Sequence, residues 1–184
     1  SALPNSPVCG TFGSNAREWL RLLAKNGIGV WQFLPLSPTD NSGSPYSSPS
    51  SFAFNPWFLD AEDLVEDGFL PEDVLKQLPG CDSKNDGYVD FELANLRSQK
   101  IGSFLRKFWN RQGALRHTQF ENWCLDQFWV QNHAYFMELR RRNEYLPWWN
   151  WSFDHYRYDQ NKLQRLKETS NENLLEDLLI QWHL

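Results

Sequence analysis

The sequence predicts an α/β protein in which a helix and a short buried strand are followed by a long loop and a mostly helical region. Residues 15–25 have the apolar spacing of an amphipathic helix. Residues 29–36 form a nearly continuous apolar run, which is typical of a buried parallel strand. From residue 60 onward the apolar residues follow helical spacing, and no convincing strand occurs. A helix packed beside a parallel strand is the repeating unit of α/β folds.

The first helix carries local start and stop signals. Asn15 can serve as its N-cap, with Glu18 at the third helical position, which is a capping-box arrangement. Asn26 and Gly27 supply the stop. In the following strand, Pro35 fits only near the end, because proline cannot donate a ladder hydrogen bond.

A serine-rich loop, residues 37–51, follows the predicted strand. It contains seven serines, three prolines, Gly43 and no aliphatic residue. Long ordered loops are usually functional, and in a (β/α) barrel the loop after a strand lies on the active-site face. The alternative is a flexible linker. We favour an ordered loop, because four large aromatic residues just after it can anchor it: Phe52, Phe54, Trp57 and Phe58.

The remainder of the chain is expected to be helical. Glycine and proline break residues 60–80 into short pieces. Longer helices are predicted over residues 96–110, 118–142 and 160–184, the last with a break near Ser170 and Asn171. The final apolar pattern, residues 173–184, has no capping residue after it, and the sequence begins without methionine. We therefore expect a chain truncated at both ends, with this last helix left unburied.

Composition excludes several function classes. The net charge is −5, and the longest basic run is the three arginines 140–142, so no nucleic-acid partner is expected. No apolar run reaches the roughly 18 residues of a membrane span, so we expect neither a membrane-spanning segment nor a secretory leader. Three scattered cysteines (Cys9, Cys81, Cys124) favour reduced thiols in a cytoplasmic protein. The four histidines show no metal-ligand spacing, so no metal is expected.

Three further patterns contain residue types that can carry chemistry. The carboxylates between Asp60 and Asp67 could include a catalytic pair, but a solvated helical face is the simpler interpretation. The tryptophans at 148, 149 and 151 could form a sugar-stacking platform, although large aromatic residues are also ordinary core residues. Residues 82–87 resemble a calcium loop but lack its ligand pattern, so an ordinary turn is expected.

Three spaced motifs resemble a known family. They are WQFLPLSPT at residues 31–39, SPY at 44–46 and SFAFNP at 51–56, and their order and spacing are similar to those of the 4-α-glucanotransferases of glycoside hydrolase family 77, the amylomaltases or disproportionating enzymes. Weaker likeness covers the rest of the chain: SALP at residues 1–4, a first helix over 10–27, VDF at 89–91, FM at 136–137, LPW at 146–148 and the helix at 176–184.

The resemblance implies a fold and an activity. The chain would be the N-terminal part of a (β/α)₈ TIM barrel, with residues 1–56 as the first β/α units and residues 57–184 as a mostly helical inserted subdomain. The family transfers α-1,4-glucan segments to glucose or another glucan by a retaining double displacement, without cofactor or metal. An Asp nucleophile, a Glu acid/base and a second Asp carry the chemistry; none is assignable here, and all are expected beyond Leu184.

The resemblance also assigns substrate-binding residues. Ser44 and Tyr46 match loop residues that contact sugars, with α-1,4-glucans as the partner. This sequence departs from the family at Asn41, where a tyrosine of a second glucan site is known, and at Gly43, where an aspartate is common; Ser47 and Pro49 depart from a usual glutamine and phenylalanine. Two alternatives to a transferase stay open: a non-catalytic α-glucan-binding module and a related hydrolase.

Overall fold

The chain folds into helices joined by long connections. The structure is a computed structural model that describes residues 3, 6, 8–40, 43–82, 88–152 and 159–184. Contacts divide the chain into two compact units: residues 1–112 with 183–184, and residues 113–182. This boundary lies inside the range 57–184 that the sequence suggested as one helical subdomain.

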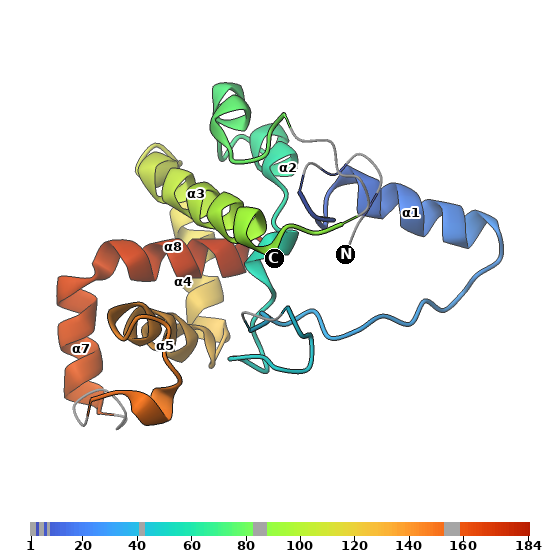
Figure 1. Cartoon of the computed structure of the whole chain (residues 1–184). Helices are drawn as coiled ribbons and strands as arrows, with labels where there is room; N and C mark the ends of the chain where they lie inside the picture. Colours follow the sequence, from blue (N-terminus) through green and yellow to red (C-terminus); the bar gives the residue numbers. More distant parts are fainter. Residues whose placement is uncertain (1–2, 4–5, 7, 41–42, 83–87, 153–158) are drawn as a thin grey trace. The chain divides into compact units, whose positions relative to one another are not determined.

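The helices follow one another along the chain as labelled in Figure 1. The first unit contains α1 (Ser14–Lys25), η1 (Pro56–Phe58), α2 (Ala61–Glu66), η2 (Glu72–Gln77) and α3 (Phe91–Trp109), where η marks a 3₁₀ helix. The second unit contains α4 (Ala114–Asp126), α5 (Val130–Arg142), η3 (Trp148–Asn150), α7 (Gln160–Thr169) and α8 (Asn171–Trp182).

Helix α1 ends as predicted but begins differently. Its N-cap is Gly13 and no side chain caps it, so the capping box predicted at Asn15 is wrong. A Cβ atom on Gly13 would overlap the Asp60 carboxylate, so a larger residue at this helix start would displace the side chain that caps α2. At the other end, Gly27 donates to Ala24 and Ile28 donates to Leu23, with Gly27 at φ +74°. This is a Schellman motif, and it confirms the predicted stop.

Residues 29–36 do not form the predicted buried strand. No strand occurs among the residues the structure describes, and a long helix-free connection leads away from α1 (Figure 1). Val30 is 86% exposed, and Trp31, Phe33 and Leu34 are also exposed. A strand is held by backbone hydrogen bonds to a neighbouring strand, and a buried one also needs a layer on each face. The described part of the chain offers neither of these to residues 29–36.

Asp60 and Asp90 start two helices of the first unit. The Asp60 side chain accepts hydrogen bonds from the backbone N–H groups of Glu62 and Asp63, both at 3.0 Å. The Asp90 side chain accepts from the N–H of Leu93 at 2.9 Å. Because of this cap, α3 begins at Phe91, five residues before the predicted start at residue 96.

The core of the first unit joins the N-terminal segment to α3. Val8, Cys9 and Ala94 are buried together, with Trp57, Val89 and Leu93 packed against them. The Cys9 thiol donates to the carbonyl oxygen of Trp57 at 3.3 Å. This contact holds η1, which is separated from the end of the serine-rich loop by four residues.

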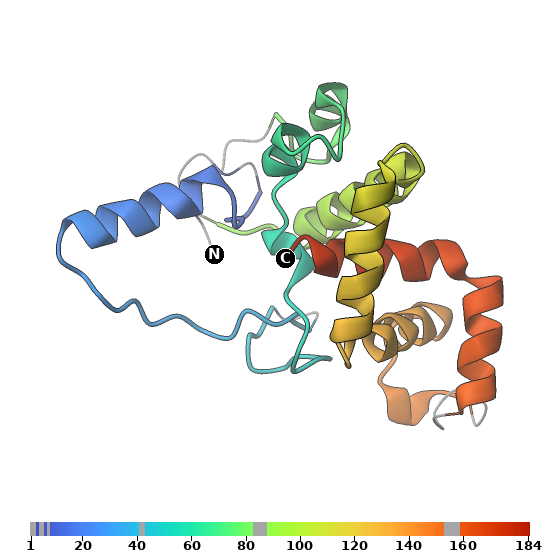
Figure 2. The same cartoon turned by 180° about the vertical axis from the view of Figure 1, so that it is seen from behind.

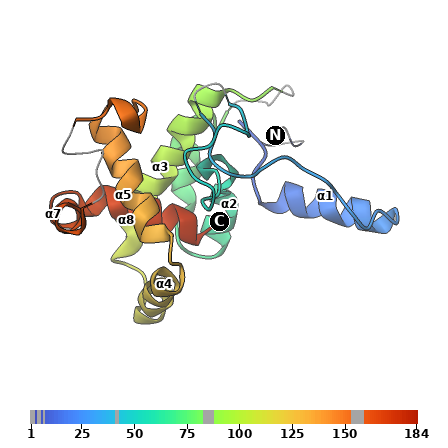
Figure 3. The same cartoon turned by 90° about the horizontal axis from the view of Figure 1, so that it is seen from below.

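In the second unit, α8 is the central helix. It contacts α4, α5 and α7, which Figure 2 shows from behind. Leu174, Leu179 and Ile180 of α8 are buried, so the expectation that this helix stays unburied is wrong: the neighbouring helices cover it. The chain changes direction between α7 and α8 (Figures 1 and 3), as the predicted break near Ser170 requires.

The helix predicted over residues 118–142 is two helices. α4 ends at Asp126 and α5 begins at Val130. Gln127 leaves the helical conformation with ψ 92°, and Val130 is completely buried. No glycine or proline marks this break, so the sequence gives no local signal for it.

No helix in the described ranges is both long and apolar enough to cross a membrane.

Candidate functional site

The serine-rich loop is closed at its base by one backbone hydrogen bond. The N–H of Asn55 donates to the carbonyl oxygen of Leu36 at 2.8 Å, which brings the two ends of the loop together. Asn55 is only 3% exposed, and its side chain accepts from the N–H of Trp57 at 3.1 Å, capping η1. The loop therefore leaves and returns at a fixed point, as an ordered loop does.

A turn around Gly43 shapes the tip of this loop. The N–H of Gly43 donates to the carbonyl oxygen of Asp40 at 3.0 Å, and the N–H of Ser44 donates to the Asp40 carboxylate at 3.3 Å. Gly43 has φ +72°, a left-handed conformation that glycine adopts at little cost. Asn41, where the sequence departs from the resembled family, lies outside the described residues.

Ser44 and Tyr46, the two predicted substrate-binding residues, lie next to each other on this turn. The N–H of Tyr46 donates to the Ser44 hydroxyl oxygen at 3.3 Å, and the N–H of Ser47 donates to the Ser44 carbonyl oxygen at 3.3 Å. The Tyr46 side chain is 77% exposed, whereas Ser44 is half-buried. The turn thus holds the backbone of both residues and presents the tyrosine ring to solvent.

Serine hydroxyls also order the returning half of the loop. Ser48 donates to the Ser50 carbonyl oxygen at 2.7 Å, and its hydroxyl oxygen accepts from the Ser50 N–H at 3.2 Å. The Ser50 hydroxyl oxygen in turn accepts from the N–H groups of Phe52 and Ala53. The high serine content therefore has a local structural reason, because these side chains replace backbone partners that a helix or sheet would supply.

Aromatic side chains anchor the loop on α3. The Phe91 ring lies against Gly43, and it stacks on the Trp57 ring with centroids 5.3 Å apart and planes 14° apart. The Trp57 indole N–H donates to the Asn95 side chain at 2.7 Å. Trp57 was expected to be an anchor, and the structure confirms it. Phe91 was not expected in this role, because nothing local to residue 91 indicates what packs on it.

A second aromatic group holds the segment after the loop. Phe12 stacks on Phe58 with centroids 4.9 Å apart and meets Phe54 edge to face at 6.1 Å. The N–H of Phe12 also donates to the carbonyl oxygen of Phe58 at 2.8 Å. Phe54 and Phe58 are thus anchors as predicted, whereas Phe52 is 57% exposed.

The carboxylates that follow the loop have structural partners. Asp60 caps α2 and accepts a hydrogen bond from the Thr11 hydroxyl. Asp63 forms a bidentate ion pair with Arg17, with N–O distances of 2.5 and 2.7 Å. Asp60 and Asp63 thus serve as a helix cap and as an ion-pair partner, and both are half-buried, not fully solvated. No cluster of metal-ligating side chains occurs in the part of the chain that the structure describes, and most of the segment 82–87 lies outside it.

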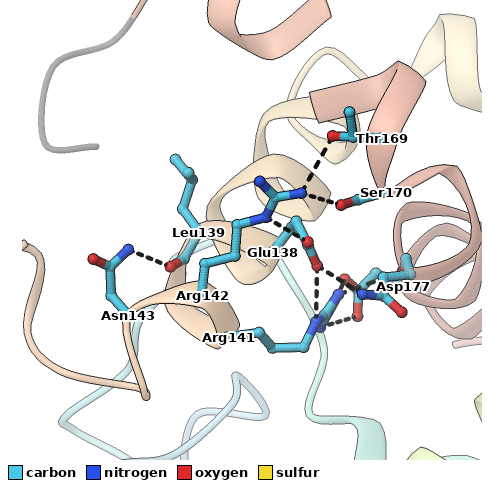
Figure 4. A network of polar contacts seen from close by, with 9 residues as sticks. Glu138, Leu139, Arg141, Arg142, Asn143, Thr169, Ser170 and Asp177 are labelled. Atoms are coloured by element: carbon cyan, nitrogen blue, oxygen red, sulfur yellow. Dashed lines mark hydrogen bonds and ion pairs between the residues drawn. The ribbon is translucent and has the colours of Figure 1, made fainter. Parts of the chain in front are cut away.

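The second unit contains a polar network that joins α5 to α7 and α8 (Figure 4). Glu138, 3% exposed, accepts from Arg142 at 2.9 Å, Arg141 at 3.2 Å and Asn173 at 3.0 Å. Arg141 also pairs with Asp177 at 2.5 Å. Burial opposes the ionisation of Glu138, but hydrogen bonds from Ser170, Arg142 and Asn173 and the charge of Arg141 lower its pKa to about 2. Burial raises the pKa of Asp177 to about 7, against the opposing charge of Arg141. Each carboxylate of the network has an arginine partner, so we assign the network to holding α5, α7 and α8 together.

The sequence model of glycoside hydrolase family 77, described as 4-alpha-glucanotransferase, matches residues 1–184 of this chain. This chain belongs to that family. A 4-alpha-glucanotransferase of Synechocystis sp. is 31% identical over 156 residues, covering 84% of this chain and 30% of that protein. The 4-alpha-glucanotransferase of Thermus thermophilus is 29% identical over 184 residues, covering 99% of this chain and 35% of that protein. The family resemblance seen in the spaced motifs is thereby confirmed.

A solved structure shows the same fold. Amylomaltase from Streptococcus agalactiae, in complex with acarbose, superposes on 99% of this chain with a TM-score of 0.88 at 21% identity. The chain covers 36% of that amylomaltase, and it spans about a third of the length of the curated relatives it matches. The helices and loops described above are thus those of one part of the amylomaltase fold.

Proposed function

We propose that this chain is the N-terminal part of a 4-α-glucanotransferase, which moves α-1,4-glucan segments from a donor to glucose or to another glucan. Membership of the family over all 184 residues supports the activity. The observation that carries the proposal within this chain is the placement of Tyr46 and Ser44. Both lie on a loop whose base is closed between Leu36 and Asn55 and whose tip is held against α3.

The two loop residues offer the contacts that a sugar needs. The Ser44 hydroxyl oxygen accepts from the Tyr46 N–H, so its own proton can be donated to a sugar oxygen. The exposed Tyr46 ring can stack on the apolar face of a glucose unit, while its hydroxyl group can donate or accept a hydrogen bond. Acarbose, bound by the amylomaltase with the same fold, is also a carbohydrate.

The exposed apolar side chains of the first unit support the barrel fold. Helix α1 buries none of its residues, although Trp19, Leu20 and Leu22 form an apolar face. The neighbouring residues 28–34 expose five large apolar side chains in addition: Ile28, Val30, Trp31, Phe33 and Leu34. So large an exposed apolar surface indicates a missing partner. We infer that residues 1–56 form the first β/α units of a (β/α)₈ barrel, that residues 57–184 form the helical inserted subdomain, and that the rest of the barrel covers this surface.

The chemistry belongs to the remaining part of such a barrel. In a retaining double displacement, an Asp attacks the sugar and a Glu first protonates the leaving oxygen and then activates the acceptor hydroxyl, while a second Asp grips the distorted ring. We expect these three carboxylates beyond Leu184, with no cofactor or metal. Within this chain, Ser44 and Tyr46 would position the glucan.

We place the protein in the cytoplasm, with α-1,4-glucans and neither nucleic acid nor membrane as partners, as the net charge of −5 and the three free thiols suggest.

Maltotriose assays of the complete gene product test the proposed reaction. Transfer converts maltotriose into glucose and longer chains, whereas a hydrolase makes only shorter products. Tyr46→Ala should weaken glucan use about tenfold, because a stacking face and a hydroxyl contact are lost together. Tyr46→Phe, which keeps the ring, should retain most of the activity. Products no longer than maltotriose would support the hydrolase instead.

The isolated chain separates the transferase from a non-catalytic binding module. We expect residues 1–184 alone to release no glucose from maltotriose, because the three carboxylates are absent from them. Glucose release by the clean recombinant chain would overturn this. A reading frame that stops at Leu184, with glucan binding intact, would instead support the binding module.

A further inference from the structure

The second unit displays three aromatic side chains directly after α5. Tyr145, Trp148 and Trp149 are 45%, 52% and 68% exposed, and we call them the aromatic surface. The two indole rings lie 5.7 Å apart with their planes at 81°. Large aromatic side chains exposed to this extent forgo the favourable free energy of burial, so a ligand or partner is expected for them.

The backbone below the aromatic surface is firmly held. The Trp151 side chain is 7% exposed, packs on Phe136 with centroids 5.4 Å apart, and donates its indole N–H to the carbonyl oxygen of Leu146 at 2.8 Å. The N–H of Asn150 donates to the carbonyl oxygen of Pro147 at 2.9 Å, closing η3. The two exposed tryptophans therefore stand on a short helix that a third, buried tryptophan fixes in place.

The backbone that leads to the aromatic surface is strained. Glu144 and Tyr145 have φ +53° and +59°, a left-handed conformation that non-glycine residues rarely adopt. Both are held there by the C-terminus of α5, where the N–H of Tyr145 donates to the carbonyl oxygen of Arg140 at 2.8 Å. Two successive strained residues are commonly found at functional sites. Tyr145, the second of the two, stands three residues before Trp148 along the chain.

Polar groups accompany the aromatic rings. The Arg140 guanidinium lies 5.6 Å from the Tyr145 ring centroid, and the side chains of Glu144 and Asn150 are exposed beside the tryptophans along the chain. A sugar presents apolar C–H faces together with hydroxyl groups around its rim. Exposed indole rings, with guanidinium, carboxylate and amide side chains within eight residues of them along the chain, offer both kinds of contact.

We propose that the aromatic surface is a second α-glucan contact, which holds a chain of the substrate outside the loop site at Tyr46. This inference rests on the proposed function for the identity of the ligand. An α-glucan suits the surface better than a protein partner does, because the surface consists of aromatic rings, with Leu146 as the one exposed large aliphatic residue between them, and uncharged sugar hydroxyls can use Arg140 and Glu144 equally well. A contact of this kind would raise the affinity for long glucans over short ones, since two linked contacts act together.

Affinity electrophoresis of the 184-residue chain in gels containing soluble starch tests this surface, with dextran gels as the α-1,6-linked control. We expect starch to retard the unaltered chain. The double variant Trp148→Ala/Trp149→Ala should bind about tenfold more weakly, because two stacking faces are removed. The matched control is Trp19→Ala/Trp31→Ala, which removes another exposed tryptophan pair, with rings 6.3 Å apart at 74°, and should leave retardation unchanged.

A readout without any substitution guards against misfolded variants. On addition of maltoheptaose to the unaltered chain, the indole N–H resonances of Trp148 and Trp149 should shift, whereas that of the buried Trp151 should not. Absence of retardation in starch, or equal retardation of the Trp148/Trp149 variant and the unaltered chain, would overturn the proposal. The surface would then be assigned to packing against the rest of a longer protein.

The gel experiment can fail while the proposed transfer reaction stands. Tyr46→Ala and the Trp148/Trp149 variant are compared in the same gels, so loss of binding in the first alone leaves the loop site standing and removes the second contact. The transfer reaction itself is judged by the products of the complete protein from maltotriose, which the aromatic surface does not determine.

Discussion

Gly43 and Phe91 lie in direct contact, so close that a Cβ atom on Gly43 would stand 2.4 Å from the Cζ atom of the phenylalanine ring. The contact joins the tip of the serine-rich loop to the first turn of α3. It also gives a physical account of the departure at position 43: the aspartate common in the family would collide with Phe91 here and would have to adopt φ +72°. The anchor of the candidate glucan site thus depends on the absence of one side chain.

Substitution of Gly43 tests this anchor. A left-handed alanine costs about 1 kcal/mol relative to glycine. Gly43→Ala should destabilise the protein by more than this, because the added methyl group also displaces Phe91. Gly27→Ala is the matched control, since Gly27 has φ +74° with no atom near its Cβ position. Urea denaturation of both variants measures the difference. In a Phe91→Ala background, Gly43→Ala should cost no more than Gly27→Ala does; an equal cost in both backgrounds would contradict the contact.

Glu144 occupies the position at the end of α5 that Gly27 occupies at the end of α1. In both Schellman motifs this residue is left-handed, but only at α1 is it glycine. Glu144→Gly should therefore stabilise the protein by up to about 1 kcal/mol in thermal or urea denaturation. Glu144→Ala is the control, since it removes the same side chain and retains the strain. A variant with glycine that is no more stable than the alanine variant would show that position 144 is unstrained.

The charge of Glu138 stabilises the second unit. Glu138→Gln should cost about 2 kcal/mol at neutral pH, because Arg141 and Arg142 lose a charged hydrogen-bond partner that is only 4% exposed. The pKa of Glu138 is lowered from 4.5 to about 2, so its contribution is fully present above pH 4.5 and is lost as the pH falls through about 2. The difference in unfolding free energy between the native chain and Glu138→Gln should therefore shrink between pH 5 and 2. Glu168→Gln, an exposed carboxylate on α7, is the control and should show little effect at any pH.

His133 is expected to stay neutral in the folded protein. Burial, assisted by the charges of Arg141 and Arg140, lowers its pKa from 6.5 to about 4. Between these values the unfolded chain binds a proton that the folded chain does not, so stability falls as the pH decreases from about 6.5 to 4. An NMR titration of the His133 ring should give the low value directly, and His133→Gln should remove this part of the pH dependence. Titration near 6.5 would show that solvent reaches the ring.

Local sequence signals predicted where helices occur. They did not predict the contacts between residues far apart in the chain that stabilise those helices. Gly27 ends α1 as predicted, because its left-handed conformation is a property of the glycine itself. The start of α3 could also have been found from the sequence, since Asp90 is an ordinary capping residue. By contrast, α4 and α5 are separated at residues 127–129 without a breaking residue, where burial of Val130 outweighs helix propensity.

The sequence alone determined the family, the serine-rich loop with Ser44 and Tyr46, and several helix ends, because motifs, turn residues and caps act over a few neighbouring residues. Only the tertiary structure decided that Phe91 holds the loop through Gly43, that Glu138 is buried among arginines, and that Trp151 is buried while Trp148 and Trp149 are exposed. Each of these depends on residues far apart in the chain or on which face a helix turns inward. The apolar run at residues 29–36 shows why the sequence alone was not enough. Its composition is that of a buried strand, but a strand also needs backbone hydrogen bonds to another segment, and the described residues supply none.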